Sequence, residues 1–519
     1  MKAVILAAGI GSRLTPITVQ RHKSCVTVGR EPILRRQLRA FEAAGVTDVT
    51  VVTGYLSDQV TGLCTSFAAD RDGFAIHTRK NEVYANTNNM YSLSLARDAV
   101  GGEPFLLANG DVVLEGDAVT ALLDADAQNA IACDTSTYSG EGMKVTVDDA
   151  GRVDHIAKDV PESEAHATSI DLYRFSASFS RKLFAEIQRR VDVESGYDDW
   201  TEVAIDALLG GAHPVEPVDV AGTDWVEVDD LDDLLTADRT FSPLDDLRSK
   251  EAVFFDLDGT LYLDDEPVDG AAEVVADLRA GDTDVYFLSN NSSRWKTDYV
   301  TKLAGLGIDA EGSQVVLSTD GVIDYLTDDG VEECYVVGTA SMREAIDEAG
   351  VDVTATDPEA VVVGFDTELT YEKVRRATLA IRDGAEFLLA HPDLVCPTAE
   401  GLVPDCGSIG ALVEAAAGRA PTRVFGKPHA EMIAPVLEEE GLSPGDVAVV
   451  GDRLETDVRL AENVGCDSVC VLTGDADRAA VEAHELSPTL VVPSVGAFRR
   501  PGATTGDETG VSEAVQETD

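Results

Sequence analysis

The stretch Ala252-Val253-Phe254-Phe255-Asp256-Leu257-Asp258-Gly259-Thr260-Leu261 decides the fold of the second half of the chain. Four apolar residues in a row predict a strand buried on both faces, as in a parallel sheet covered by helices. Asp256 and Asp258 follow at its end, where open α/β sheets place their reactive groups. Such a pair can attack phosphorus and move a proton to the leaving oxygen. The alternative is an acidic turn without function, since the chain holds 95 acidic residues.

Three further motifs follow in order. Phe287-Leu288-Ser289-Asn290-Asn291 is an apolar run ending in a hydroxyl and amides, which suit hydrogen bonds to a phosphoryl group. Gly426-Lys427-Pro428 supplies a cation, and Val447–Val450 leads to carboxylates at Asp452 and Asp457. The four motifs together resemble the haloacid dehalogenase (HAD) superfamily over approximately residues 250–495.

The resemblance implies a magnesium-dependent phosphatase that works through an aspartyl-phosphate. It makes Asp256 the nucleophile, Asp258 the acid and base, and Lys427 the neutralising cation, and it implies phosphate contacts from Ser289 and Asn290. The implied Mg²⁺ ligands are Asp256, Asp258 and Asp452. The segments Val361–Asp366, His391–Asp393 and Cys406–Gly410 resemble the cap of NagD-like (subfamily IIA) phosphatases, so an inserted α/β cap is expected at about 325–420.

The first half of the chain opens with a strand that runs into the glycine-rich turn Ala8-Gly9-Ile10-Gly11-Ser12-Arg13. Small residues let backbone N–H groups approach phosphate oxygens. With Lys23 and the segment Gly29–Leu34, this turn resembles the sugar-phosphate nucleotidyltransferases over roughly the first 240 residues. The resemblance implies that Ala8, Gly9 and Gly11 contact the NTP and that Arg13 and Lys23 neutralise its phosphates; His22 departs from the proline usual before that lysine.

Two acidic motifs complete this first pattern. Leu107-Ala108-Asn109-Gly110-Asp111 places a carboxylate at the end of an apolar run, and Trp225–Asp229 resembles the closing motif of the family. The resemblance implies that Asp111 binds Mg²⁺ with a second carboxylate, and the sequence leaves both Glu227 and Asp229 as candidates. The alternative for Asp111 is a turn carboxylate or helix cap.

The segment Tyr84–Leu93 is rich in asparagine and resembles the phosphocholine and inositol-phosphate cytidylyltransferase branch. Asparagine carries donors and acceptors that can read a base edge or a polyol, so Asn88 and Asn109 are predicted nucleotide or substrate contacts. The alternative is an Asn-rich turn that caps a helix. CTP is the favoured nucleotide, and small phosphomonoesters are the expected partners of both sites.

The charge balance is extreme, with 40 Lys and Arg against 95 Asp and Glu and a net charge of −55. A surface of this sign repels nucleic acid and anionic lipid headgroups. No stretch approaches 18 apolar residues, so membrane insertion is not expected. The uniform acidity and eight scattered cysteines favour the reducing cytoplasm of a halophile; homo-oligomerisation stays open.

The predicted fold class is α/β throughout. Residues 1–240 are expected to form a Rossmann-like (GT-A-like) mixed sheet, 241–250 a linker, 251–497 a HAD domain with a parallel sheet and a cap, and 498–519 a disordered tail. We predict a bifunctional enzyme that transfers a nucleotidyl group, favoured as CMP, and hydrolyses a small phosphomonoester, with Mg²⁺ in both domains. The alternative keeps only the phosphatase catalytic and makes the first domain a nucleotide-binding regulatory module.

Overall fold

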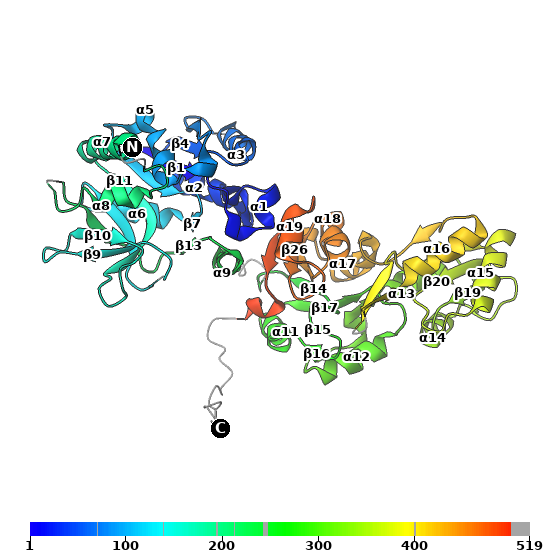
Figure 1. Ribbon diagram of the computed structural model, residues 1–519. Coiled ribbons are helices and arrows are strands. Elements are labelled where there is room, and N and C mark those ends of the chain that lie inside the picture. The colour runs from blue at the N-terminus through cyan, green and yellow to red at the C-terminus, as the bar shows by residue number, and fades with distance from the viewer. Residues whose placement is uncertain are drawn as a thin grey trace, which may run out of the picture. The chain divides into compact units, whose positions relative to one another are not determined.

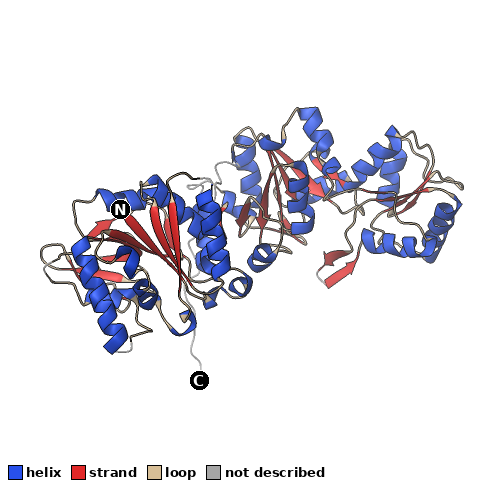
Figure 2. Ribbon diagram, turned by 90° about the horizontal axis from the view of Figure 1, so that it is seen from above, coloured by secondary structure: helices blue, strands red, loops and turns tan. Residues whose placement is uncertain are grey.

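The computed structural model describes residues 1–69, 71–138, 140–193, 196–211, 213–241, 248–398 and 401–499 (Figure 1). These residues form two compact units. The first holds Met1–Pro243 together with Ala476–Val492, and the second holds the remaining described residues. In each unit helices lie on both sides of the strands, as Figure 2 shows. Among the described residues, no helix is both long and apolar enough to cross a membrane.

The first unit is built on a mixed sheet. Its main path runs β10 (Val153–Ala157), β9 (Lys144–Val147), β11 (Ala167–Phe175), β6 (Phe105–Asn109), β1 (Lys2–Ala7), β4 (Asp48–Thr53) and β5 (Ala75–Lys80), with β8 (Ala130–Asp134) and β12 (Glu216–Asp219) branching from β11. The strands β6, β1, β4 and β5 are parallel, whereas β11 runs antiparallel to β6. The predicted mixed α/β sheet is confirmed.

Alternation along β1 explains why this strand is apolar throughout. Ala3 and Ile5 enter one buried cluster, and Val4 and Leu6 enter another on the opposite face of the sheet. The helices of this unit are α1 (Ile17–Gln20), α2 (Ile33–Ala43), α3 (Ser57–Ala69), α4 (Asn89–Ser94), α5 (Arg97–Val100), α6 (Gly116–Asp124), α7 (Ala177–Val193), α8 (Thr201–Asp206), α9 (Leu231–Phe241) and α19 (Arg478–Ala483). Since successive side chains of a strand point to opposite faces, both faces of β1 must be covered.

Short strand pairs frame the edge of this sheet. β7 (Val112–Leu114) pairs with β13 (Trp225–Glu227), and β2 (Thr27–Val28) pairs with β3 (Glu31–Pro32). The β7–β13 pair brings the Asp111 turn beside the closing acidic motif, because Val228 N–H also donates to the carbonyl of Asp111 at 3.0 Å.

The second unit carries a sheet in the order β18 (Val315–Leu317), β17 (Asp284–Ser289), β14 (Ala252–Asp256), β25 (Val447–Gly451), β26 (Asp467–Val471) and β27 (Leu490–Val492), and the first five of these strands run parallel. Its helices are α11 (Ala271–Ala280), α12 (Lys296–Gly305), α13 (Ser318–Asp328), α17 (Ala434–Glu440) and α18 (Arg459–Val464), and a short hairpin joins β15 (Tyr262–Leu263) to β16 (Glu266–Pro267). Because neighbouring strands run the same way, their carboxyl ends gather Asp256, Ser289 and the Asp452 turn at one edge.

A second, smaller sheet is inserted in this unit. Its parallel strands are β19 (Cys334–Val337), β20 (Ala360–Val363), β21 (Glu386–Leu389) and β24 (Arg423–Val424), with α14 (Ala340–Glu348), α15 (Tyr371–Asp383), α16 (Cys406–Ala417) and the hairpin β22 (Val395–Thr398)–β23 (Gly401–Pro404). A separate apolar cluster fills it. The expected inserted α/β cap is therefore present, with its sheet ending at Val424.

The predicted domain limits stay a prediction. Ala476–Val492 is grouped with the first unit, whereas its strand β27 lies in the sheet of the predicted HAD domain, which was expected to run through 497. Phe498, placed at the start of the predicted tail, is buried, and Arg248 donates to its carbonyl at 2.8 Å. Residues 500–519 of the tail and 242–247 of the linker lie outside the described residues.

Candidate active sites

The first site forms where the glycine-rich turn meets the β6 edge. Gly11 adopts a left-handed backbone, with φ of +67°, and a Cβ there would lie 3.1 Å from Lys23 Cβ. Gly110 lies so close to β1 that a Cβ would approach the carbonyl oxygen of Leu6 to 2.7 Å. These two glycines let three chain segments converge, because no other residue fits without displacing its neighbours.

Lys23 lies at the centre of this convergence. Its Nζ donates to Asp111 Oδ2 and to Asp229 Oδ1, each at 2.8 Å. Arg13 Nη2 pairs with Asp229 Oδ2 at 2.5 Å, and Arg13 also pairs with Glu141. Burial alone would lower the pKa of Lys23, but the two aspartates outweigh it and raise that pKa. The site therefore holds two cations that can meet phosphate oxygens.

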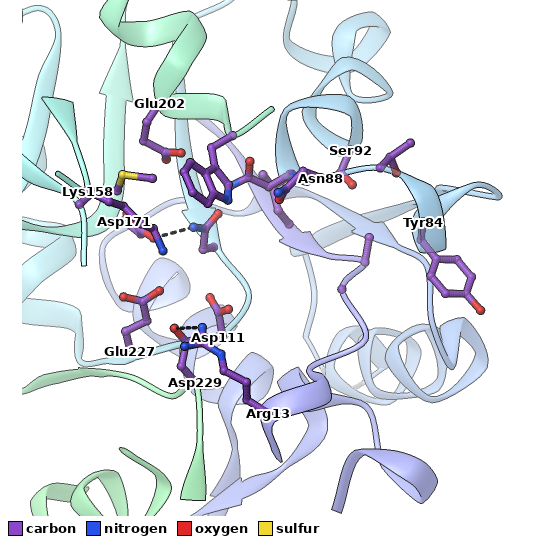
Figure 3. A pocket seen from close by; sticks show the side chains of 18 residues that line it. Arg13, Tyr84, Asn88, Ser92, Asp111, Lys158, Asp171, Glu202, Glu227 and Asp229 are labelled. Carbon is purple, nitrogen blue, oxygen red and sulfur yellow. Dashed lines mark hydrogen bonds and ion pairs between the residues drawn. The ribbon is translucent and has the colours of Figure 1, made fainter. Parts of the chain in front are cut away.

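Three carboxylates of this site could share a divalent cation. Oxygens of Asp111, Glu227 and Asp229 lie within 4.8 Å of one another. In Figure 3 these side chains point toward one another, with Arg13 beside Asp229. Asp111 Oδ1 is buried without a hydrogen-bond partner in the described part of the chain. Oxygen ligands and an unpaired carboxylate oxygen fit Mg²⁺, which prefers hard oxygen donors.

Glu227 and Asp229 differ in their surroundings. Burial, followed by the charges of Asp171 and Asp111, raises the pKa of Glu227 to about 9. Burial also acts on Asp229, but Lys23 and Arg13 outweigh it and lower the pKa of that carboxyl. Asp229 is thus ionised and already paired with two cations, whereas Glu227 gains most from a bound positive ion.

A cavity of about 250 Å³ opens beside this cluster. It is lined by the predicted residues Ala8, Gly9, Arg13, Asn88, Asn109, Asp111, Glu227 and Asp229. Tyr84 and Thr87 of the asparagine-rich segment also line it, as do Lys158 and Asp171, which the sequence patterns did not single out. Gly11 does not line it and instead packs against Lys23. Asn88 lines the cavity, as the nucleotide-contact prediction expects, and it also caps α4, as the alternative expects, because its side chain accepts from Asn89 N–H at 2.8 Å.

A buried acidic pair forms one wall of the cavity. Tyr173 Oη lies 2.9 Å from Asp171 Oδ1 and 2.8 Å from Glu202 Oε1. One hydroxyl proton cannot serve both contacts, so one carboxyl must donate its own proton. Burial raises the pKa of Asp171 to about 7 and also raises that of Glu202. The wall therefore carries a shared proton, as coupled carboxyls do.

The second site lies at the carboxyl edge of the parallel sheet. Lys427 Nζ bridges Asp256 and Asp457, with 2.6 Å to Asp457 Oδ1. Burial raises the pKa of Asp256 well above its ordinary value, with Lys427 opposing and Asp457 adding to the rise. The lysine therefore lies against the predicted nucleophile, where it can offset the charge of an incoming phosphate.

Asp452 supplies the third carboxylate of this site. Oxygens of Asp256, Asp452 and Asp457 lie within 4.8 Å of one another, and Asp452 Oδ1 is buried without a hydrogen-bond partner among the described residues. Burial, then the charge of Asp457, raises the pKa of Asp452 to about 6. A Cβ on Gly259 would lie 2.5 Å from Asp452 Oδ2, so glycine makes room for this carboxylate. The donor set and the unpaired oxygen fit Mg²⁺.

The other predicted residues of this site take different positions. Asp258 lies outside the three-carboxylate cluster but lines the same cavity, and burial raises its pKa, as an acid catalyst requires. Ser289 lines the cavity and accepts from Asn291 N–H at 3.2 Å. Asn290 also lines the cavity, and it holds the backbone of Lys427: its Oδ1 accepts from the Lys427 N–H at 2.7 Å and its Nδ2 donates to the Lys427 carbonyl at 3.0 Å.

The cavity over these groups is small, about 80 Å³. Cap residues Asp393, Cys396 and Asp405 form its far wall with Arg453. His391 is fully buried between Asp393 and Asp405, with a ring nitrogen 3.5 Å from each. The cap therefore reaches the reacting carboxylates, as a lid that excludes water and reads the leaving group would.

Comparison with known proteins assigns a family to the second half of the chain. The family model "Haloacid dehalogenase-like hydrolase" matches residues 253–352, and "HAD-hyrolase-like" matches 424–498. Acid sugar phosphatases of Staphylococcus epidermidis and Staphylococcus aureus are each 33% identical over 245 residues, which cover 47% of this chain and 94% of theirs. The chain belongs to the haloacid dehalogenase-like hydrolases.

The first half of this HAD protein matches another family model, "MobA-like NTP transferase domain", over residues 3–195. The chain is therefore an enzyme in which a nucleotidyltransferase is fused to a HAD phosphatase. Among solved structures, a 4-nitrophenylphosphatase from Thermotoga maritima is 36% identical and covers 49% of this chain and 97% of its own, with a TM-score of 0.48. A glycerol phosphate phosphatase from Mycobacterium tuberculosis in complex with magnesium is 30% identical, covers 49% of this chain and 78% of its own, and has a TM-score of 0.45.

Several site residues of the HAD protein carried no sequence signal. Asp171 reaches the first cavity from β11 and Lys158 from the turn after β10, and Arg453 reaches the second cavity from the turn after β25. Arg453 adjoins Asp452 in the motif and could have been found by that proximity. Asp171 and Lys158 depend on how β11 and the β10 turn pack, which no local pattern encodes.

Proposed function

We propose that the chain is a bifunctional enzyme. The first unit transfers a nucleotidyl group, with CTP as the favoured donor, to the phosphate of a small phosphomonoester and releases pyrophosphate. The second hydrolyses a small phosphomonoester. One observation carries both assignments: in each unit a buried lysine bridges two aspartates at a sheet edge. Each cluster also has a third carboxylate and one buried carboxylate oxygen without a hydrogen-bond partner among the described residues.

In the transfer reaction the acceptor phosphate is already a nucleophile, so no side chain must remove a proton. Arg13 and Lys23 would hold the phosphates of the donor and balance the charge that grows on the leaving pyrophosphate. Mg²⁺ held by Asp111 with Glu227 or Asp229 would add Lewis-acid charge at the same oxygens. The cavity wall with Asp171 and Glu202 would face the acceptor.

In the hydrolysis Asp256 would attack phosphorus and form an aspartyl-phosphate, while Asp258, protonated because burial raises its pKa, would give its proton to the leaving oxygen. Asp258 would then take a proton from the attacking water. Lys427 would balance the phosphate charge, and Mg²⁺ held by Asp256 and Asp452 would supply Lewis-acid charge. Asp457, within the same cluster, would hold Lys427 in place.

The test is an assay of the full chain in molar KCl, which screens a net charge of −55. Each of the four NTPs is offered with a panel of sugar, polyol and amino-alcohol phosphates. Pyrophosphate release that needs both an NTP and an acceptor supports the transfer, and orthophosphate release without NTP supports the hydrolysis. Nucleotide binding without pyrophosphate release under any pairing would instead select a regulatory first unit.

A further inference from the structure

Gln37 is a polar residue on the apolar face of α2. It lies three residues after Leu34 and four before Phe41, and both of these belong to a buried apolar cluster of the first unit. The Gln37 side chain is itself fully buried. Burying an amide is costly unless the amide forms hydrogen bonds, so the contacts of Gln37 show what this polar group does in the core.

The amide nitrogen of Gln37 holds both ends of the turn that carries Asp111. Its Nε2 donates to the carbonyl of Asn109 at 2.7 Å and to the carbonyl of Val112 at 2.8 Å. Asn109 is the last residue of β6, and Val112 is the first residue of β7. The two bonds therefore use both amide protons and enclose Gly110 and Asp111 between them.

The two carbonyls also fix the orientation of the Gln37 amide. A carbonyl oxygen can only accept a hydrogen bond, so the nitrogen of the amide must face this pair. The other amide atom, Gln37 Oε1, is buried without a hydrogen-bond partner in the part of the chain that the structure describes. The Gln37 amide thus supports this one turn and does not link it to a wider polar network.

Backbone bonds hold the middle of the same turn. Gly110 N–H donates to the carbonyl of Leu6 at 2.9 Å, and Val228 N–H donates to the carbonyl of Asp111 at 3.0 Å. Without the Gln37 amide, the carbonyls at the two ends of the turn would face an apolar side chain and lose these bonds. The turn would then shift, and the Asp111 carboxylate would shift with it.

We propose that Gln37 is a positioning residue of the divalent-cation site in the first unit, and that it acts by fixing the turn from Asn109 to Val112. This turn sets where the Asp111 carboxylate lies relative to Glu227 and Asp229, since oxygens of the three lie within 4.8 Å of one another. Removing a group that orients a metal ligand typically weakens metal binding by about 10- to 100-fold. The inference rests on the proposed function only through the cation that the transfer would use, so metal binding tests it without turnover.

The test compares Gln37→Met with Asn129→Leu in the full chain. Each change replaces a buried amide by an apolar side chain of similar size. Asn129 is 2% exposed and lies in the same unit, where its Nδ2 donates to the carbonyl of Pro214 at 3.0 Å and its Oδ1 accepts from Ser176 N–H at 2.9 Å. None of these three residues lines the first cavity, so Asn129→Leu measures the loss of a buried amide away from the cation site.

The first readout is the dissociation constant of Mn²⁺, followed by electron paramagnetic resonance. All variants carry Asp452→Asn, and the first-unit ion is the one that a further Asp111→Asn change removes. Below the melting temperature of both proteins, we expect Gln37→Met to raise the Kd of this ion by about 10- to 100-fold and Asn129→Leu to keep it within about twofold. An unchanged Kd in Gln37→Met, equal changes in the two variants, or no ion removed by Asp111→Asn would overturn the proposal.

Gln37→Glu separates the hydrogen bonds from the packing of the side chain. It keeps the shape of glutamine, but a carboxylate has no proton for the two carbonyls and a carboxylic acid has only one. We expect this variant to weaken Mn²⁺ binding at least as much as Gln37→Met does, and wild-type affinity in Gln37→Glu would overturn the proposal. If one of the two variants fails to fold, the other decides.

Kinetics separate the failure of this inference from the failure of the proposed function. If transfer occurs, the Mg²⁺ concentration for half-maximal pyrophosphate release should rise in Gln37→Met and not in Asn129→Leu. A substitution that only destabilises the fold would lower the active fraction without changing this concentration, and that result would overturn the positioning role. If the wild type releases no pyrophosphate with any NTP and acceptor, transfer is refuted, and the Kd of Mn²⁺ alone decides the inference.

Discussion

The two sites share a lysine that bridges two aspartates, but they differ in how far this lysine is buried and in the size of the cavity beside it. Lys23 bridges Asp111 and Asp229 in the transferase unit, and Lys427 bridges Asp256 and Asp457 in the phosphatase unit. The lysine side chain is 10% exposed in the first and 4% in the second. The cavities differ in the same direction, about 250 Å³ against about 80 Å³.

This difference follows the size of what each site must admit. A nucleotide and an acceptor need an open cavity, whereas hydrolysis needs one small ester and gains from excluding water. The cap side chains Asp393 and Asp405 close the phosphatase cavity, and no equivalent insertion lies in the described part of the transferase unit. Enclosure therefore separates the two chemistries more clearly than the charged groups do.

The largest expected effect is the loss of phosphatase activity alone. Asp256→Asn removes the nucleophile, so orthophosphate release should fall by about 10⁴- to 10⁶-fold. Pyrophosphate release should stay within about twofold, since Asp256 lies in the other unit. Phosphate release by a malachite-green assay and pyrophosphate release by a coupled assay measure the two rates. Retained phosphatase activity would refute the nucleophile assignment.

The converse change should give a smaller loss. Asp111→Asn removes one charge from the carboxylate cluster and one partner of Lys23, and should lower pyrophosphate release by about 10²- to 10³-fold. Asp224→Asn, an exposed carboxylate before the closing motif, is the control and should leave the rate unchanged. A loss of orthophosphate release in Asp111→Asn would contradict the separation of the sites.

The deeper burial of Lys427 should also show in the free energy of unfolding. Lys427→Met leaves Asp256 and Asp457 buried without their cation, which should cost about 3–5 kcal/mol of unfolding free energy. Lys23→Met should cost less, about 1–2 kcal/mol, because its partners border an open cavity and Asp229 keeps Arg13. Urea unfolding followed by tryptophan fluorescence measures both. Equal costs would show that enclosure does not distinguish the sites.

The smallest effect concerns His22 and pH. Burial lowers the pKa of His22 to about 4, while Asp111 opposes and Lys23 adds to the fall. The unfolded chain takes up a proton near pH 6.5 and the folded one does not, so stability falls with pH from about 6.5 toward 4. His22→Asn can still accept from Ser24 N–H, as His22 Nδ1 does at 3.1 Å, but has no proton to gain.

Between pH 7 and pH 5.5 the wild type should therefore lose about 1 kcal/mol more than His22→Asn. Chemical denaturation at the two pH values gives this double difference, in which the titration of other groups cancels. An equal pH dependence in the two proteins would mean that His22 is protonated in the folded state.

The sequence predicted what local patterns encode. The apolar runs at Ala252–Phe255 and Val447–Val450 became neighbouring parallel strands, because a continuous apolar run needs cover on both faces. Turns at the ends of these strands brought Asp256 and Asp452 together. The lysine bridges were not predicted, since each joins a loop to carboxylates up to 206 positions away.

The sequence patterns did not predict contacts that depend on how distant segments pack together. Asn290 follows a strand end and stays a predicted phosphate contact, but the sequence did not indicate that both of its polar groups would also hold the backbone of Lys427. Such contacts depend on how distant segments are brought together, which hydrophobic period and turn chemistry leave open.

The central claim is that each unit holds its own divalent cation on carboxylates at a sheet edge. Titration of the wild type, Asp111→Asn and Asp452→Asn with Mn²⁺, followed by electron paramagnetic resonance, tests it most directly. The account predicts two Mn²⁺ per wild-type chain and one in each variant. Two ions retained in either variant, or both lost through a single substitution, would contradict it.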